Sequence, residues 1–291
     1  MTRISELLAS GPTYSFEFFP PKNDVEHAVL AKTLRDLEPL DPSFVSVTYR
    51  GGRISRQRTY DLVTGMLHTT SLNPMAHLIC VAHTRLELAD ILVSFRQAGI
   101  DNLLALGGDE PSDPDDGPGE LRHAIELVEL AQAIGGFSIG VAAHPALHPR
   151  SESRRTDRDY LAAKLRLADF AVTQFFFDVA DYEGLIEDLG RRGLDKPVLP
   201  GIMPVDTLRS IDRMATMGSP LPAWAIRRLE DADAKGGAAA VRSEGIAIAT
   251  ELCQALLERG APGLHFYTLN RSSATREIYN ALGLGRVASA R

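Results

Sequence analysis

The chain has 291 residues, of which 44% are hydrophobic and 24% are charged, and its formal net charge is −7 at pH 7. This composition is typical of a soluble globular protein, and it excludes a disordered or fibrous chain. Because the net charge is negative and the basic residues form no stripe, we expect no nucleic-acid partner.

Short β-rich runs alternate with longer helical patterns along the whole chain, which is typical of a parallel sheet with crossover helices. The predicted strands are, in chain order, 14–19, 44–48, 75–81, 102–106, 138–142, 170–176, 198–202 and 263–267. Eight strands favour a closed barrel over an open doubly wound sheet. We therefore predict an α/β fold, an eight-stranded (β/α)8 barrel of the TIM type, with residues 1–291 as one catalytic domain.

Two segments between the strands carry recognisable local signals. Thr84 and Glu87 form a capping box before an apolar stripe, which predicts a helix after the third strand. Residues 203–263 are longer than one βα unit requires, and Gly236 and Gly237 interrupt them. We expect extra helices there, before the last strand.

Cysteine usage and apolar runs bear on the compartment. Cys80 and Cys253 are the only cysteines, one in a predicted strand and one in a helical run, so neither a disulfide framework nor a cysteine metal site is predicted. The N-terminus has no long apolar stretch, and 18 consecutive apolar residues occur nowhere. We expect a cytoplasmic protein without an export signal or a membrane partner.

Polar residues at the carboxyl ends of the strands are functional candidates, because active sites of β/α barrels lie there. This criterion selects Glu17, Thr48, His77, Asp109, His144, Gln174, Tyr267 and Arg271.

Glu17 lies in SFEFFPPK, between phenylalanines. Desolvation by apolar neighbours favours the neutral form of a carboxyl group, which can then donate a proton near neutral pH. The alternative is a strand glutamate that pairs with a Lys or Arg of the barrel, and spacing alone does not decide between the two.

Asp109 and Gln174 can recognise a heterocyclic ligand. Asp109 follows two glycines that allow close backbone approach, and its carboxylate accepts hydrogen bonds from amino groups; capping of a loop or helix is the alternative. The amide of Gln174 both donates and accepts, which suits a lactam edge, unless it only satisfies backbone groups inside the barrel. The acidic, proline-rich segment 109–119 is typical of a mobile loop.

The histidines at 77, 83, 144 and 148 raise the alternative of a metal-dependent barrel hydrolase. Pro145 and Pro149 disfavour a helix that would pair His144 and His148 as ligands, and no HExxH or HxH motif is present. We therefore predict no metal site. No GxGxxG or P-loop motif occurs either, so a nicotinamide would bind at the barrel mouth.

With these residues placed, the sequence closely resembles the methylenetetrahydrofolate reductase family from about Tyr14 to Leu284. The matching blocks follow one another along the chain, most of them at the ends of predicted strands, which is more specific than any lone motif. They are SFEFFPPK (15–22), FVSVTYRGG (44–52), GGDEP (107–111), VAAHPALHP (141–149), VTQFFFD (172–178), LPGIMPV (199–205), LPAW (221–224) and HFYTLNRS (265–272).

The resemblance implies reduction of 5,10-methylenetetrahydrofolate to 5-methyltetrahydrofolate, with NADH or NADPH as hydride donor. By this resemblance Glu17 matches the general acid, Asp109 the carboxylate that holds the pterin, and Gln174 the amide that faces it. Three more residues of matching blocks are assigned to substrate binding: Thr48, Tyr267 and Arg271. Protonation at N10 would open the five-membered ring and leave an N5 iminium that accepts hydride.

Most members of this family bind FAD, and the resemblance assigns cofactor binding to His77, His144, Asp157, Lys164 and Met214. Several of the positions depart from the family pattern. Gly107 stands where a flavin-contacting Arg is expected, His144 replaces a Tyr, and Arg150 replaces a Glu. Tyr160 replaces a small polar residue, and Met214 replaces an aromatic one. We therefore expect hydride to pass directly from the nicotinamide to the folate, without FAD.

Other interpretations stay open at this point. The same reaction could run through bound FAD, or a flavin barrel oxidoreductase could act on another amine or imine. A noncatalytic folate-binding barrel is a further alternative, against which Glu17 argues. The sequence leaves open whether the chain forms a homo-oligomer.

Overall fold

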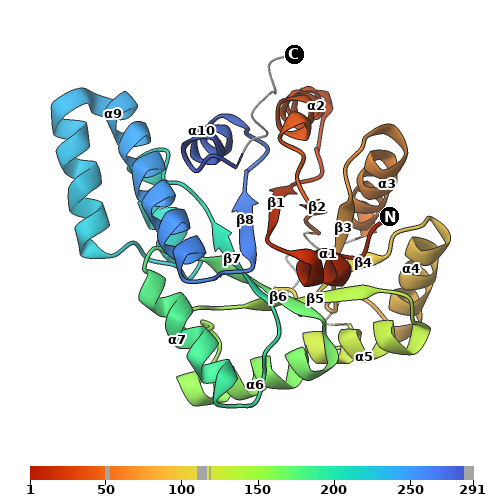
Figure 1. The fold of residues 1–291 in the computed structure, drawn as a ribbon. Coiled ribbons are helices and arrows are strands. Elements are labelled where there is room, and N and C mark those ends of the chain that lie inside the picture. The colour runs from red at the N-terminus through yellow and green to blue at the C-terminus, as the bar shows by residue number, and fades with distance from the viewer. Residues whose placement is uncertain (50–52, 110–116, 118, 285–291) are drawn as a thin grey trace.

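The computed structural model describes residues 1–49, 53–109, 117 and 119–284. Eight parallel strands close into one barrel in chain order, β8 pairing with β1, and helices surround them (Figure 1). The strands are β1 (Thr13–Phe18), β2 (Phe44–Val47), β3 (Pro74–Ile79), β4 (Asn102–Leu106), β5 (Ser138–Ala143), β6 (Phe170–Phe175), β7 (Val198–Ile202) and β8 (Gly263–Tyr267). The predicted (β/α)8 barrel is confirmed.

Helices precede β1, occupy the connections between the strands and follow β8. They are α1 (Ile4–Ser10), α2 (Asp24–Leu37), the short 3-10 helix η1 (Glu38–Leu40), α3 (Arg53–Thr69), α4 (Arg85–Gln97), α5 (Ala124–Ile134), α6 (Arg154–Leu167), α7 (Val179–Gly190), α8 (Arg209–Thr216), α9 (Ala223–Glu258) and α10 (Ser273–Ala281). The predicted capping box before α4 is present, since Thr84 accepts from the Glu87 N–H and Glu87 from the Thr84 N–H. The predicted loop at 109–119 lies largely outside the described residues.

The connection between β7 and β8 is extended, as predicted. It contains α8 and the long α9, whose backbone leaves the helical region at Gly236 and Gly237 (φ 60° at the latter), so that α9 is in effect two helices joined at a break. Figure 1 shows the two arms of α9 lying at one side of the barrel, near α10.

Alternation along the strands separates an outer core from an inner one. Phe16 and Phe18 of β1 are fully buried in the cluster between the strands and the surrounding helices. Inside the barrel, Ile4 of α1 packs with apolar side chains of the strands, namely Phe44, Met75, Leu104, Phe170, Val172 and Leu199. This layer fills the amino-terminal part of the barrel.

Helix α1 closes the amino-terminal end of the barrel. The N–H of Ile4 bonds to the Asn102 side chain at 2.9 Å, and that of Ser5 bonds to Ser138 Oγ at 3.0 Å, which ties the helix to the first residues of β4 and β5. With this end filled, the polar side chains of the interior lie toward the carboxyl ends of the strands.

Both cysteines are buried and free, in agreement with the predicted absence of a disulfide. Among the described helices, none combines the length and the apolar character that a membrane span requires.

Candidate active site

Glu17 lies inside the barrel near the carboxyl ends of the strands. Strand register places it beside Ser46 of β2 and Tyr267 of β8. Its side chain is only 8% exposed, and Oε2 lies 3.5 Å from Nε2 of His265 and 3.7 Å from Nε2 of His77. Two imidazoles therefore flank the carboxyl group.

The prediction that apolar side chains surround the carboxyl group of Glu17 is wrong. Phe16 and Phe18 precede and follow it in the sequence, but successive side chains of a strand point to opposite faces, and both rings lie in the outer core. Within 3.7 Å of its Oε2 atom lie the Nε2 atoms of two histidines instead. The alternative of a Lys or Arg partner for Glu17 is not observed among the described residues.

His265 was missed by the sequence criterion, which considered only the last residues of each strand. Its Nδ1 lies 2.7 Å from Ser15 Oγ, and its Nε2 lies 3.4 Å from Ser46 Oγ as well as facing Glu17. The ring stacks on Phe44 at a centroid distance of 6.0 Å. Its spacing of two residues from Tyr267 was the available signal, because it puts both side chains on the inner face.

His77 is buried, and its Nε2 has no hydrogen-bond partner within the part of the chain that the structure describes. Burial lowers the pKa of His77 to about 4, although the carboxylate of Glu17 acts in the opposite direction. The ring is therefore neutral at neutral pH. Its Nε2 atom, which faces the carboxyl group of Glu17, is available to bind a ligand or a water molecule.

The neutral His77 predicts a pH dependence of stability. Its folded pKa of about 4 lies below the ordinary value of 6.5, so between these values the unfolded chain binds the extra proton and the free energy of unfolding falls as pH decreases. We expect this residue to contribute a slope of up to ~1.4 kcal/mol per pH unit. Urea denaturation from pH 7 to pH 4.5 should show a shallower slope for His77→Asn. Equal slopes for wild type and His77→Asn would contradict the assignment, and His27→Asn at an exposed position is the control.

Tyr267 closes one side of the site. Its hydroxyl donates to the Thr173 carbonyl at 2.7 Å, and burial raises its pKa well above the usual value. The ring lies against Gly201 of β7, where a Cβ atom would come within 2.6 Å of Tyr267 Cε2. A residue without a side chain is therefore required at position 201 for Tyr267 to take this position.

Gln174 and His144 line one pocket at the barrel mouth. Its other walls come from the segment after β5, from the end of β6 and the residues after it, from α7 and from the turn before α9: Pro145, Ala146, Leu147, Phe175, Phe176, Phe177, Asp181, Gly218, Ser219 and Pro220. The Gln174 carbonyl oxygen accepts from the Phe175 N–H at 3.1 Å. The amide nitrogen of Gln174 is thus the group left to face a ligand as a donor.

Three predicted substrate-binding residues lie around the mouth. Thr48 follows β2, and its Oγ1 is buried without a hydrogen-bond partner among the residues described. Asp109 follows β4 and is exposed. Its charge raises the pKa of His148, but burial of the imidazole lowers that pKa by more. Arg271 follows β8 and is exposed, and its charge lowers the pKa of Asp206, against the larger raising by burial.

The predicted cofactor residues after β5 are already engaged with protein groups. Asp157 forms an ion pair with Arg158 at 2.5 Å through Oδ2 and accepts from Ser151 Oγ at 3.1 Å through Oδ1. Lys164 Nζ donates to the Ala142 carbonyl at 2.8 Å, and burial lowers the pKa of Lys164 to about 8. Lys164 therefore supports the backbone of β5, and both carboxylate oxygens of Asp157 are engaged by neighbouring side chains.

His144 and Met214 have different surroundings. The His144 ring packs edge-on against the His148 ring, with 4.5 Å between the ring centroids. Burial lowers the pKa of His144 to about 3, and nearby cationic groups act in the same direction. Met214 is only 2% exposed and packs in a separate core cluster with Phe175 and Val205. The role in cofactor binding that the resemblance assigns to Met214 stays a prediction, and in this structure its side chain contacts core residues.

No group of three or more potential metal ligands occurs among residues 1–49, 53–109, 117 and 119–284. His83 is engaged separately from His77, since His83 Nε2 lies 2.8 Å from the Tyr49 hydroxyl oxygen.

Comparison with known proteins matches residues 3–283 to the family model described as methylenetetrahydrofolate reductase. The 5,10-methylenetetrahydrofolate reductase of Escherichia coli K12 is 35% identical over 272 residues, which cover 93% of this chain and 90% of that protein. The enzyme of Pectobacterium carotovorum with the same name is 34% identical, with the same coverage.

Two further similarities extend the comparison. Methylenetetrahydrofolate reductase (NADH) 1 of Arabidopsis thaliana is 32% identical over 299 residues, and the match covers 97% of this chain but half of the plant protein. A protein of Clostridium thermocellum described as binding two copies of 5-methyl-5,6,7,8-tetrahydrofolic acid superposes with a TM-score of 0.69 at 14% identity, covering 96% of this chain and 97% of that chain. The second likeness shows the barrel fold alone. From the family match and the bacterial relatives, the chain belongs to the methylenetetrahydrofolate reductase family of oxidoreductases.

Proposed function

We propose that this chain reduces 5,10-methylenetetrahydrofolate to 5-methyltetrahydrofolate with hydride taken directly from NADH or NADPH, without FAD. The observation that carries the folate chemistry is Glu17, a buried carboxyl group at the barrel mouth within 3.7 Å of two histidine rings. The names of the bacterial relatives support the substrate.

Glu17 supplies the proton in this proposal. A proton transferred from its carboxyl group to N10 opens the five-membered ring, and the N5 iminium that remains is electrophilic at its exocyclic carbon. His265, held by Ser15 and Ser46, fixes the carboxyl group from the inner side of the barrel. The pterin is held by the carboxylate of Asp109 and the amide of Gln174, which lie at the ends of different strands.

The hydride comes from a dihydronicotinamide at the same mouth. Relatives from Arabidopsis thaliana and rice carry NADH in their names, which supports a nicotinamide donor. An iminium accepts hydride from a dihydropyridine when the two carbons are held at about 3–3.5 Å. Both ligands must then occupy the barrel mouth together.

The residues present do not fit FAD well, which supports direct transfer. Both carboxylate oxygens of Asp157 are engaged, by Arg158 and by Ser151, so this side chain would have to break an ion pair to bind a cofactor hydroxyl. Gly107 offers no cation for a pyrophosphate, and its place is normally taken by an Arg in the family. The described geometry therefore favours a mouth shared by two dissociable ligands.

The second candidate is the same reduction through bound FAD. Lys164 favours it, since its ammonium group lies at a flavin-matching position and burial keeps it away from bulk solvent. A noncatalytic folate-binding barrel is disfavoured because a buried carboxyl group is costly to retain without a chemical role.

The two mechanisms differ in spectrum and in kinetics. We expect purified protein to lack the visible absorption of a flavin and initial-rate data to give intersecting double-reciprocal lines, as a ternary complex requires. Near-stoichiometric FAD that NADH bleaches and methylenetetrahydrofolate reoxidises at the turnover rate would overturn direct transfer and leave the folate assignment intact. Absence of turnover with either nicotinamide, with and without added FAD, would overturn the proposed reaction.

A further inference from the structure

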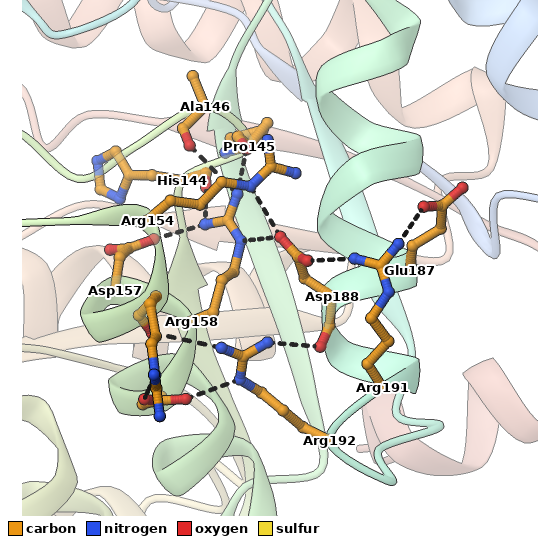
Figure 2. A network of polar contacts seen from close by, with 12 residues as sticks. His144, Pro145, Ala146, Arg154, Asp157, Arg158, Glu187, Asp188, Arg191 and Arg192 are labelled. Carbon is orange, nitrogen blue, oxygen red and sulfur yellow. Dashed lines mark hydrogen bonds and ion pairs between the residues drawn. The ribbon is translucent and has the colours of Figure 1, made fainter.

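Arg158 of α6 is a fully buried arginine beneath the segment that follows β5. Its guanidinium group donates to three consecutive carbonyl groups of that segment (Figure 2): Nη1 to His144 at 2.9 Å, and Nη2 to Pro145 and, at 3.2 Å, to Ala146. A single side chain thus fixes the backbone direction of three successive residues.

Two carboxylates hold the charge of Arg158 in place. Nη1 pairs with Asp157 on the same helix at 2.5 Å, and Nε lies 3.4 Å from Asp188 of α7. Asp188 also binds Arg154 and Arg191, each at 2.8 Å. Figure 2 shows that the network runs from the segment after β5 through α6 to α7.

The three residues held by Arg158 also form a wall of the pocket that contains Gln174. Their carbonyl groups bond to Arg158, so the contact fixes this wall through its backbone rather than through its side chains. The same segment carries His144 and His148, whose rings pack together at 4.5 Å. The position of this wall therefore depends on Arg158, whose side chain does not line the pocket.

We propose that Arg158 is a positioning residue, which sets the shape of the pocket wall formed by residues 144–146 before any ligand binds. An arginine suits this role because its planar fork presents donors in fixed directions. Its two Nη atoms donate to the three carbonyl groups and to Asp157, and Nε faces Asp188 at 3.4 Å. A lysine keeps the charge but cannot reach all these acceptors from one nitrogen. The kinetic consequence rests on the proposed function, since it assumes that a reaction ligand contacts this wall.

Amide hydrogen exchange of the ligand-free protein tests the positioning role without reference to activity. The Ser151 N–H bonds to the His148 carbonyl and the Arg150 N–H to His148 Nδ1, so peptides covering 144–153 exchange faster if the segment opens. We expect Arg158→Met to accelerate this exchange about tenfold or more and Arg158→Lys to give an intermediate rate. Arg154→Met is the matched control, because Arg154 binds the same Asp188 but none of the three carbonyl groups.

Exchange at the wild-type rate in folded Arg158→Met, or equal acceleration by Arg154→Met, would overturn the proposal. If Arg158→Met does not fold, Arg158→Lys decides: wild-type exchange in 144–153 overturns the role, and acceleration confined to this segment supports it.

Steady-state kinetics then separate the positioning role of Arg158 from the proposal that a reaction ligand binds at this wall. We expect Arg158→Lys to raise KM for the nicotinamide or the folate about fivefold or more with kcat changed less. Faster exchange with unchanged KM values would retain the positioning role and contradict the binding of either ligand at this wall.

Discussion

Replacement of Glu17 by glutamine is expected to lower kcat at least about a hundredfold, because an amide preserves the shape of the side chain but cannot supply the proton that opens the folate ring. The dissociation constant for the folate should change much less. Stopped-flow or steady-state reduction of methylenetetrahydrofolate measures the first quantity, and equilibrium titration measures the second. The prediction follows from the burial of Glu17 and its position between His77 and His265.

A matched control is Glu129→Gln, which makes the same chemical change at an exposed position of α5. It should retain wild-type turnover. Near-normal turnover of Glu17→Gln would rule out Glu17 as the general acid. A large rise in the dissociation constant for the folate in this variant, with kcat at saturating folate unchanged, would instead indicate a binding role.

Asp109→Ala is expected to weaken folate binding by roughly 1.5–3 kcal/mol, which corresponds to about a tenfold to hundredfold larger dissociation constant. The variant removes a charged acceptor for the pterin amino and amide groups. In the free protein Asp109 is exposed, so its loss should change the free energy of unfolding little. Calorimetric titration with a folate, together with urea denaturation, measures both quantities.

Asp90→Ala in α4 removes an exposed carboxylate elsewhere and should leave folate affinity unchanged. Gln174→Leu should weaken folate binding in the same direction as Asp109→Ala but less, because a neutral hydrogen bond is worth less than a charge-assisted one. Unchanged folate affinity in Asp109→Ala would return Asp109 to a role in capping the loop after β4.

The architecture was predictable from local patterns because each strand carries its own signal. The bounds of β4, β7 and β8 are those predicted, and the break in α9 occurs at the two glycines that the sequence singled out. These features depend on hydrophobic periodicity and backbone preference, which are properties of short segments. A closed barrel then follows from the number of strands.

Which side chains meet inside the barrel was only partly predictable. Selecting the strand ends found Glu17, His77 and Tyr267, which the structure brings together, but it omitted His265. The stagger of the strands decides this, because it brings Ser15 of β1 level with His265 of β8. Register is a long-range property that no single segment encodes.

The environment of each residue was decided by tertiary structure. The phenylalanines beside Glu17 in the sequence point away from it, and Met214 packs in a core cluster of its own. Arg158 carried no motif, yet it is fully buried and holds three carbonyl groups. The sequence by itself therefore determined the fold class, the order of the elements and most residues at the mouth, since these follow from local periodicity and strand ends. Only the tertiary structure decided the partners of Glu17, Asp157 and Arg158, because the packing of separate strands and helices determines which charges are buried and which groups can satisfy them.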